Sequence, residues 1–136
     1  MAVTFATDEW VKAVQEELNA SEAYKKAAAK WEGDFYFVVE EGPGFPEDTY
    51  LYLDLWHGDA RDAYLASDPA AKSTAFELRA PLDVWKGVLN KQIDPIRGIM
   101  GRQLKLKGNM MKVMKAPKAA TELVECAARV ETVWPE

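Results

Sequence analysis

The most informative part of the chain reads Ile96-Arg-Gly-Ile-Met-Gly-Arg-Gln-Leu-Lys-Leu-Lys-Gly-Asn109. An Asp-Pro pair directly before it is typical of a helix start, and Gly101 is typical of a helix end. The following residues 102–107 alternate between polar and apolar, which predicts a strand with its two leucines facing the core and its lysines facing out. Gly108-Asn109 then predicts a turn. The segment therefore joins a short helix, a strand and a turn in a fixed order.

The sequence on either side of this segment is helical in pattern. After the turn, residues 110–115 form a short predicted helix, and Pro117 occupies the first position of a last one. Before the segment, Pro81 likewise begins a helix. Apolar residues at helical spacing give the two longer helices a core-facing side each: Leu82, Trp85, Val88 and Leu89 in the first, and Ala120, Leu123, Val124 and Ala127 in the last.

The N-terminal half is predicted to contain two helices followed by four strands. Thr7 or Asp8 can cap the first helix, and Ser21 can cap the second. The strands are predicted at residues 35–39, 49–56, 60–66 and 73–79, and their spacing favours an antiparallel meander. With the strand at 102–107, we expect one α+β domain spanning residues 1–136, built on a five-stranded, mainly antiparallel sheet covered by helices.

Composition excludes several classes of protein. Of the 136 residues, 49% are hydrophobic and 29% are charged, which is ordinary for a folded domain and excludes a disordered chain. A single cysteine, Cys126, and a single histidine, His57, exclude a disulfide framework and argue against a metal site, so we expect no metal and no cofactor. No stretch approaches the ~20 apolar residues of a membrane span, and the first residues lack a signal-peptide pattern, so we expect a cytoplasmic protein.

Charge is distributed unevenly along the chain. The net charge is −5, but residues 1–68 hold 5 basic and 15 acidic side chains, whereas residues 69–136 hold 12 basic and 7 acidic ones. Between residues 86 and 118, Asp94 is the only acidic side chain. Such a basic stretch indicates either a solvated face or a surface for transient contact with an anionic membrane. It lacks interleaved aromatic residues, so we expect no nucleic-acid partner.

Methionines cluster in the same part of the chain. Four of the five lie between residues 100 and 114, close to several isoleucines. Methionine is unbranched and polarizable and suits a surface that repacks around different apolar ligands, whereas a defined core uses it sparingly. Because the helices here are short and interrupted by Asp94-Pro95, Gly101 and Gly108, the pattern favours the movable wall of a cavity. An ordinary methionine-rich core is the alternative.

Few residues could support catalysis. Tyr52 and Asp54 share one face of a predicted strand and His57 lies in the next turn, so these are the candidates for a small cavity enzyme of the isomerase or lyase type. The alternative is that this strand face is simply polar and that the histidine is a solvent-exposed turn residue. Cys126 lies among alanines and is interpreted as a buried small residue. We therefore expect no enzyme activity and name no catalytic residue.

The order of these elements resembles the sterol carrier protein type 2 family. From Phe76 to about Val124 the chain shows a Phe-x-Leu strand, a helix carrying Trp85, the segment 96–109 and a final helix, in the order of that family. The most specific part is the end of the segment, because the family's fifth strand commonly reads Gly-Lys-x-Lys-x-x-Gly followed by Asp or Asn. Here Arg102 replaces the first lysine and keeps its charge. The resemblance covers nearly the whole chain and is closest over residues 73–125.

The resemblance implies an apolar tunnel, enclosed by the helices and the sheet, that binds and transfers a lipid without catalysis. It implies fatty acids, acyl-CoA, isoprenoids or sterol-like molecules as ligands. The chain ends at Glu136 without a Ser-Lys-Leu signal, which suits a stand-alone, prokaryotic-like member for which a sterol is the least expected ligand. The candidate lipid-binding residues are Phe76, Leu78, Trp85, Leu89, Ile93, Ile96, Ile99, Met100, Leu104, Met110, Met111 and Met114.

Three functions are thus compatible with the sequence: a lipid-binding or lipid-transfer module, a small cavity enzyme, and a structural or oligomerisation domain with a filled core. An internal volume well above that of a few water molecules separates the binding module from the filled core. A carboxylate pointing into that volume with a strongly raised pKa favours the enzyme. The sequence leaves the oligomeric state, monomer or dimer, open.

Overall fold

The structure of the protein is a computed structural model that describes residues 2–135. Its helices are α1 (Asp8–Ala20), α2 (Glu22–Ala27), α3 (Leu82–Leu89), α4 (Pro95–Met100), α5 (Met110–Met114) and α6 (Pro117–Ala128). Its strands are β1 (Val3–Thr4), β2 (Glu32–Val39), β3 (Thr49–Trp56), β4 (Asp59–Ala66), β5 (Phe76–Ala80), β6 (Lys105–Lys107) and β7 (Thr132–Val133), and a short 3-10 turn, η1 (Pro69–Ala71), follows β4. The predicted α+β class is confirmed.

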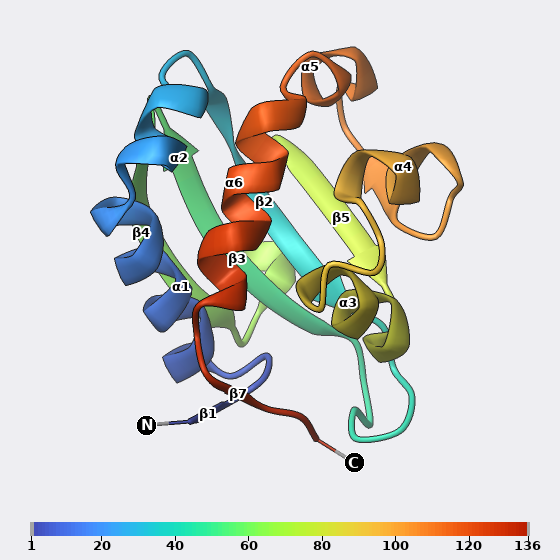
Figure 1. Cartoon of the computed structure of the whole chain (residues 1–136). Coiled ribbons are helices and arrows are strands. Elements are labelled where there is room, and N and C mark those ends of the chain that lie inside the picture. Colours follow the sequence, from blue (N-terminus) through green and yellow to red (C-terminus); the bar gives the residue numbers. More distant parts are fainter. Residues whose placement is uncertain (1, 136) are drawn as a thin grey trace.

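Five strands form one sheet in the order β4-β3-β2-β5-β6 (Figure 1). Neighbouring strands are antiparallel except β2 and β5, which run parallel with Phe35 opposite Phe76. The sheet is therefore mainly antiparallel, as predicted, but the prediction that its first four strands form a meander is wrong. The run 35–39 has no charged side chain on either face, which suits a central strand, and β5 crosses over to pair with it instead of with β4.

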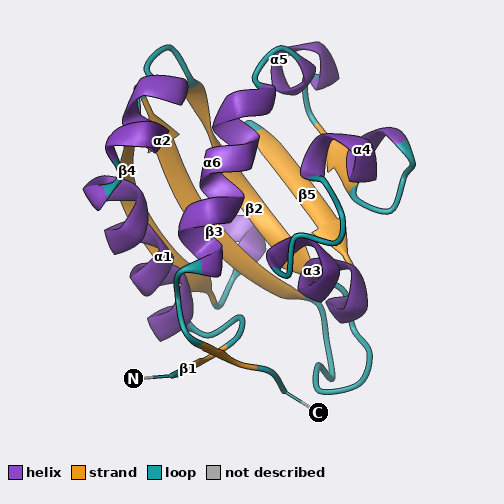
Figure 2. Ribbon diagram, viewed as in Figure 1, coloured by secondary structure: helices purple, strands orange, loops and turns teal. Residues whose placement is uncertain are grey.

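The helices lie on one face of the sheet, with α6 across its centre and α1 over the side formed by β3 and β4 (Figure 2). Every second strand residue points into this layer, because successive side chains of a strand alternate between its faces. Phe35 of β2 and Leu53 of β3 face the helices, and Val11 and Leu18 of α1 are completely buried in the same core. The main core of the protein therefore lies between the sheet and the helices.

The opposite face of the sheet carries a second, smaller cluster of buried residues. Tyr36, Val38 and Tyr52 form it, and Tyr50 and Tyr64 pack around them. In Figure 1 this face points away from the viewer, and the connection that contains η1 lies behind the sheet. The two faces of one sheet thus carry different chemistry, apolar toward the helices and rich in tyrosine on the other side.

Helix starts follow the predicted capping residues. The backbone N–H of Trp10 donates to the Thr7 hydroxyl, and Ser21 and Asp94 accept in the same way at the starts of α2 and α4. Asn109 caps α5. These contacts are local in sequence, so the sequence alone could locate them.

Several details differ from the sequence-based predictions. The strand predicted at residues 73–79 spans Phe76–Ala80, and Pro81 is the cap residue before α3 and not its first residue. Arg102 has a left-handed φ of 62°, and the carbonyl of Gly98 accepts from the N–H groups of both Gln103 and Leu104, so β6 begins only at Lys105. In addition, β1 and β7 form an unpredicted two-stranded parallel pair that ties the two ends of the chain together. Strands of two residues are too short to show an alternating pattern.

Candidate functional site

An apolar cavity of about 90 Å³ lies between the sheet and the C-terminal helices. Its walls come from β2, β3, β5, the β6 region and α2–α6, and include Trp31, Leu78, Ile99, Leu104 and Val113. These residues are far apart in the sequence. The alternation of β5 and the helical spacing of α4 bring them to one side of the sheet.

A second apolar cavity, of about 70 Å³, lies beside the first, between the sheet and α1. Trp10 and Val14 of α1 line it, together with Leu51 of β3 and Leu89 of α3. Five side chains line both cavities and so separate one from the other: Phe37, Trp85, Val88, Leu123 and Val124. The partition between the two spaces therefore consists of side chains from β2, α3 and α6.

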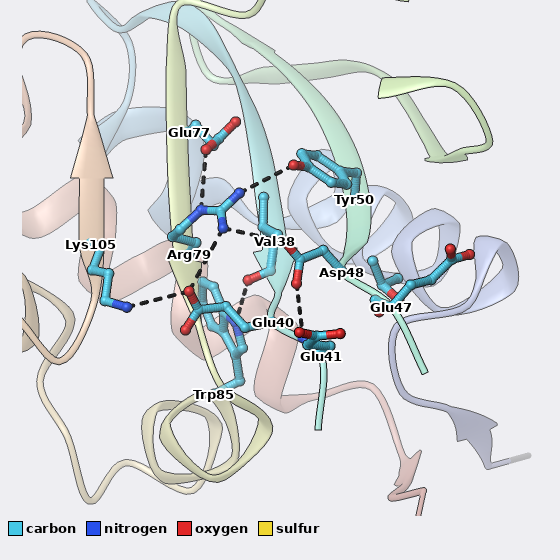
Figure 3. A network of polar contacts seen from close by, with 11 residues as sticks. Val38, Glu40, Glu41, Glu47, Asp48, Tyr50, Glu77, Arg79, Trp85 and Lys105 are labelled. Carbon is cyan, nitrogen blue, oxygen red and sulfur yellow. Dashed lines mark hydrogen bonds and ion pairs between the residues drawn. The ribbon is translucent and has the colours of Figure 1, made fainter. Parts of the chain in front are cut away.

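Trp85 is the most firmly held member of this partition. Its indole N–H donates to the backbone carbonyl of Val38 over 2.9 Å (Figure 3). Its ring meets that of Phe37 edge-to-face at a centroid distance of 6.1 Å. The hydrogen bond satisfies the one polar group of a buried indole. The other four members, Phe37, Val88, Leu123 and Val124, are apolar, so packing alone holds their side chains in place.

Both cavities are too small to hold a ligand with a long apolar chain. An apolar cavity of about 150 Å³ binds a molecule as small as benzene, whereas pockets for larger ligands usually measure about 300–1,000 Å³. Each cavity here is smaller than the cavity that binds benzene. The structure does not show the continuous tunnel that the resemblance implies. A ligand with a long apolar chain thus requires side chains of the partition or whole helices to move outward.

The structure places the candidate lipid-binding residues in three different environments. Leu78, Trp85, Ile99 and Leu104 line the larger cavity, and Trp85 and Leu89 line the smaller one. Phe76 is buried and stacks on Phe35, and three others are half-buried against the core: Ile93, Ile96 and Met114. Met100, Met110 and Met111 are 70%, 48% and 64% exposed, so the structure places them on the surface and not against either cavity.

Sequence reasoning missed the residues that other elements contribute to the cavities. Phe35 and Phe37 of β2, and Leu123 and Val124 of α6, line one or both of them. The apolar run 35–39 and the apolar side of the last helix were visible in the sequence. Their convergence with α3 and α4 was not, because it depends on the crossover that places β5 next to β2.

The three candidate catalytic residues each have another partner, and none lines either cavity. The Tyr52 hydroxyl donates to Asp34 over 2.9 Å, and burial, followed by this hydrogen bond, raises the pKa of Tyr52. Asp54 accepts two hydrogen bonds from Arg61 at 3.1 Å. The Nε2 atom of His57 lies 2.7 Å from the Oε2 atom of Glu32, and both side chains are exposed. The geometry thus does not bring an acid and a base together in an apolar space.

The remaining reactive groups do not form a site either. Cys126 is buried in α6, and this burial raises the pKa of its thiol. Within residues 2–135, no group of three or more His, Cys, Asp or Glu side chains is arranged to hold a metal ion. None of the helices in this part of the chain combines the length and apolar character needed to cross a membrane.

The exposed methionines belong to a region that we call the α4–α5 wall, residues 95–116. Both short helices contact α6 (Figure 1). Residues of α6 such as Ala120 line the larger cavity. Lys112 connects α5 to the first residue of β2, because its ammonium donates to the carbonyl of Glu32. The same ammonium lies 5.0 Å from the centre of the Trp31 ring. Trp31 and Val113 line the larger cavity, so this contact lies next to that cavity.

Comparisons with known proteins agree with this architecture. Residues 3–120 match the SCP-2 sterol transfer family. A crystal structure of sterol carrier protein 2 is 36% identical with a TM-score of 0.84, and the match covers 93% of this chain and 98% of that one. A conserved hypothetical protein from Thermus thermophilus, described as possibly a sterol carrier protein, is 33% identical over 98% of this chain and 94% of that one, also with a TM-score of 0.84.

More distant structures share the fold. Sterol Carrier Protein-2 from Aedes aegypti, in complex with the C16 fatty acid palmitate, is 10% identical with a TM-score of 0.56 over 91% of this chain and 98% of that one. The comparison with curated proteins found no significant match. The family match covers most of the chain and two solved structures exceed 30% identity, so the chain belongs to the SCP-2 sterol transfer family.

Proposed function

We propose that the protein binds a lipid with a long apolar chain between its helices and its sheet, and that it catalyses no reaction. The observation that carries this proposal is the pair of adjacent apolar cavities that only side chains separate. A filled structural core does not need two such spaces side by side. Among residues 2–135, no acid and base converge at either cavity, which favours binding over the enzyme alternative.

The ligand class follows from the apolar side chains that line the two cavities. Burial of one methylene group contributes ~0.8 kcal/mol, so about ten to fifteen buried methylenes supply the roughly 8 kcal/mol of micromolar binding and part of its entropic cost. A fatty acid, an acyl thioester or an isoprenoid has an apolar chain of this length. The family membership and the palmitate bound to the Aedes aegypti protein of the same fold make palmitate the first probe.

The α4–α5 wall is the proposed place of lipid uptake and release. Three exposed methionines lie there beside cationic side chains such as Arg97 and Lys115, a combination that suits an anionic membrane surface. Movement of α5 away from Trp31 would separate Val113 from Trp31, two residues that line the larger cavity, and would break the contact of Lys112 with the Trp31 ring. Transfer of lipid between membranes is the activity that such a wall supports.

The test is lipid binding by a variant in which the larger cavity is filled. Ala120 of α6 lines this cavity, and Ala120→Leu adds apolar volume inside it. Ala20 lies exposed in α1, so Ala20→Leu is the matched control. We expect Ala120→Leu to weaken displacement of a fluorescent fatty acid by palmitate at least tenfold and the control to leave it unchanged. Both variants must keep the circular dichroism of the wild type.

Lipid that remains bound during purification without detergent, detected by native mass spectrometry, would add direct support. The proposal is wrong if a folded Ala120→Leu variant binds palmitate with unchanged affinity. It is also wrong if the wild-type protein retains no lipid and palmitate displaces no fluorescent fatty acid from it.

A further inference from the structure

The walls of the two apolar cavities have no charged group among the residues that the structure describes. A fatty acid carries a carboxylate at neutral pH, as the side chain of glutamate does. A carboxylate without a partner is costly to bury among apolar side chains. The head group of a bound fatty acid therefore has to stay at the rim of a cavity, beside a cation or in water.

Lys112 is the cation that touches the wall of a cavity. Four lysine and arginine side chains of residues 2–135 lie over aromatic rings, and only Lys112 lies over a ring that lines a cavity, that of Trp31. Val113, the next residue of α5, lines the same cavity. Lys112 is also half-buried, whereas Arg97 and Lys115 of the same α4–α5 wall are exposed.

The contacts of Lys112 leave its charge without a carboxylate partner. Its ammonium donates to the backbone carbonyl of Glu32, which is a neutral acceptor, and it forms no ion pair within the described part of the chain. An ammonium group has three N–H donors, so it can contact a further acceptor.

The carboxylate of Glu32 belongs to the opposite face of the sheet. Successive side chains of β2 alternate between the two faces, and Phe35 and Phe37 line the cavities, so the side chain of Glu32 points the other way. There its carboxylate lies 2.7 Å from Nε2 of His57. The side of the larger cavity at Trp31 and Val113 is therefore bordered by a cation.

We propose that Lys112 binds the carboxylate of a lipid whose apolar chain lies in the larger cavity, so that the preferred ligand is a free fatty acid. This inference rests on the proposed function, because it names the head group of the lipid that the cavities bind. A contact of the ammonium with a carboxylate is stronger than its present contact with a carbonyl. A fatty acid thus compensates for the loss of the contact between α5 and β2, and a lipid with an uncharged head group does not.

The experiment compares two ligands with the same chain, palmitate and hexadecanol, on the full chain at pH 8. Each displaces the fluorescent fatty acid, and the affinity of each variant for the fluorescent fatty acid is measured separately. We expect the wild type to bind palmitate about tenfold more tightly than hexadecanol, because only palmitate forms a charged hydrogen bond. The ratio of the two affinities is the readout, because loss of the contact between α5 and β2 affects both ligands alike.

Three variants test the role of Lys112. In Lys112→Met the preference for palmitate is expected to fall to about onefold, and Lys112→Arg is expected to keep it. Lys118 is exposed in α6, outside the α4–α5 wall, so Lys118→Met is the matched control and is expected to keep the tenfold preference. All three variants must keep the circular dichroism of the wild type.

Equal affinity of the wild type for palmitate and hexadecanol overturns this inference and leaves the proposed function intact. A preference that persists in folded Lys112→Met overturns it as well, because another group then binds the carboxylate. The same loss of preference in Lys118→Met assigns the preference to the overall positive charge of the region and also rejects the role of Lys112. If neither ligand binds the wild type, the proposed function itself is wrong, and this inference fails with it.

Discussion

Two regions of the helical layer face the same sheet but differ in how they are held. The wall formed by α1 buries Val11 and Leu18 completely, and its first residue, Asp8, accepts a hydrogen bond from the backbone N–H of Leu65 in β4. The α4–α5 wall consists of two short helices and exposes Met100 and Met111. On the basis of this difference we propose that the wall formed by α1 is fixed and that the α4–α5 wall moves when lipid binds.

The partition between the cavities lies between these two walls, on β2, α3 and α6. Trp85 is anchored to the sheet through Val38, whereas Leu123 and Val124 belong to α6, which contacts both α1 and the α4–α5 wall. In the proposed lipid-bound state, α4 and α5 move outward and free the space beside α6 while α1 stays in place. A bound chain can then extend from the larger cavity into the smaller one, along a wall that does not move.

The largest expected effect is a difference in the free energy of unfolding between a variant of the α1 wall and a variant of the α4–α5 wall. Leu18→Ala on α1 removes a side chain with 0% exposure and is expected to lower the free energy of unfolding by about 2–5 kcal/mol. Met111→Ala on α5 removes one with 64% exposure and is expected to change it by about 0.5 kcal/mol or less. Urea denaturation of both variants provides the measurement. Similar losses in the two variants would contradict the distinction between the walls.

The sequence predicted most of the elements because their signals are local. Alternation in 49–56 gave the exact bounds of β3, and Thr7, Ser21 and Asp94 marked helix starts. The wrong prediction, the meander, concerned which strands pair, and this depends on contacts between distant segments. Local propensity carries no information about such pairing.

The candidate site was predictable in part for the same reason. Trp85, Ile99 and Leu104 were selected from apolar spacing, and they line the larger cavity. Met110 and Met111 were selected from composition, which cannot tell an apolar side chain that faces inward from one that faces solvent on a helix as short as α5. Whether these methionines contact lipid stays a prediction, now tied to uptake at the surface.

A smaller effect is expected on the rate of lipid transfer. Arg97 and Lys115 are exposed on the α4–α5 wall, and each cation near an anionic membrane contributes about 1 kcal/mol of attraction. The double variant Arg97→Glu/Lys115→Glu is expected to slow transfer of a labelled fatty acid to anionic vesicles about tenfold, and added salt is expected to reduce the difference. Equilibrium affinity for the fatty acid is expected to stay the same.

The control for charge alone is Lys26→Glu/Arg129→Glu, which makes the same change at exposed positions of α2 and at the end of α6. Equal slowing by both double variants would show that net charge, and not the α4–α5 wall, governs transfer. If the rate of transfer by the wild type depends on neither vesicle charge nor salt, the basic stretch is a solvated face without a role in transfer.

The smallest expected effect concerns a polar contact of the fixed wall. The Lys12 ammonium lies 2.8 Å from both oxygens of Asp8, and this contact, with the hydrogen bond from Leu65, lowers the pKa of the Asp8 carboxyl. A carboxyl with a lower pKa in the folded state stabilises the fold above its unfolded pKa of about 4, and this contribution is lost as the pH falls through the folded value. Asp8→Asn is therefore expected to be slightly less stable than the wild type at pH 7. In urea denaturation at pH 7 and pH 3 the difference should shrink at the lower pH, and a constant difference would show that Asp8 holds α1 to β4 through its geometry alone.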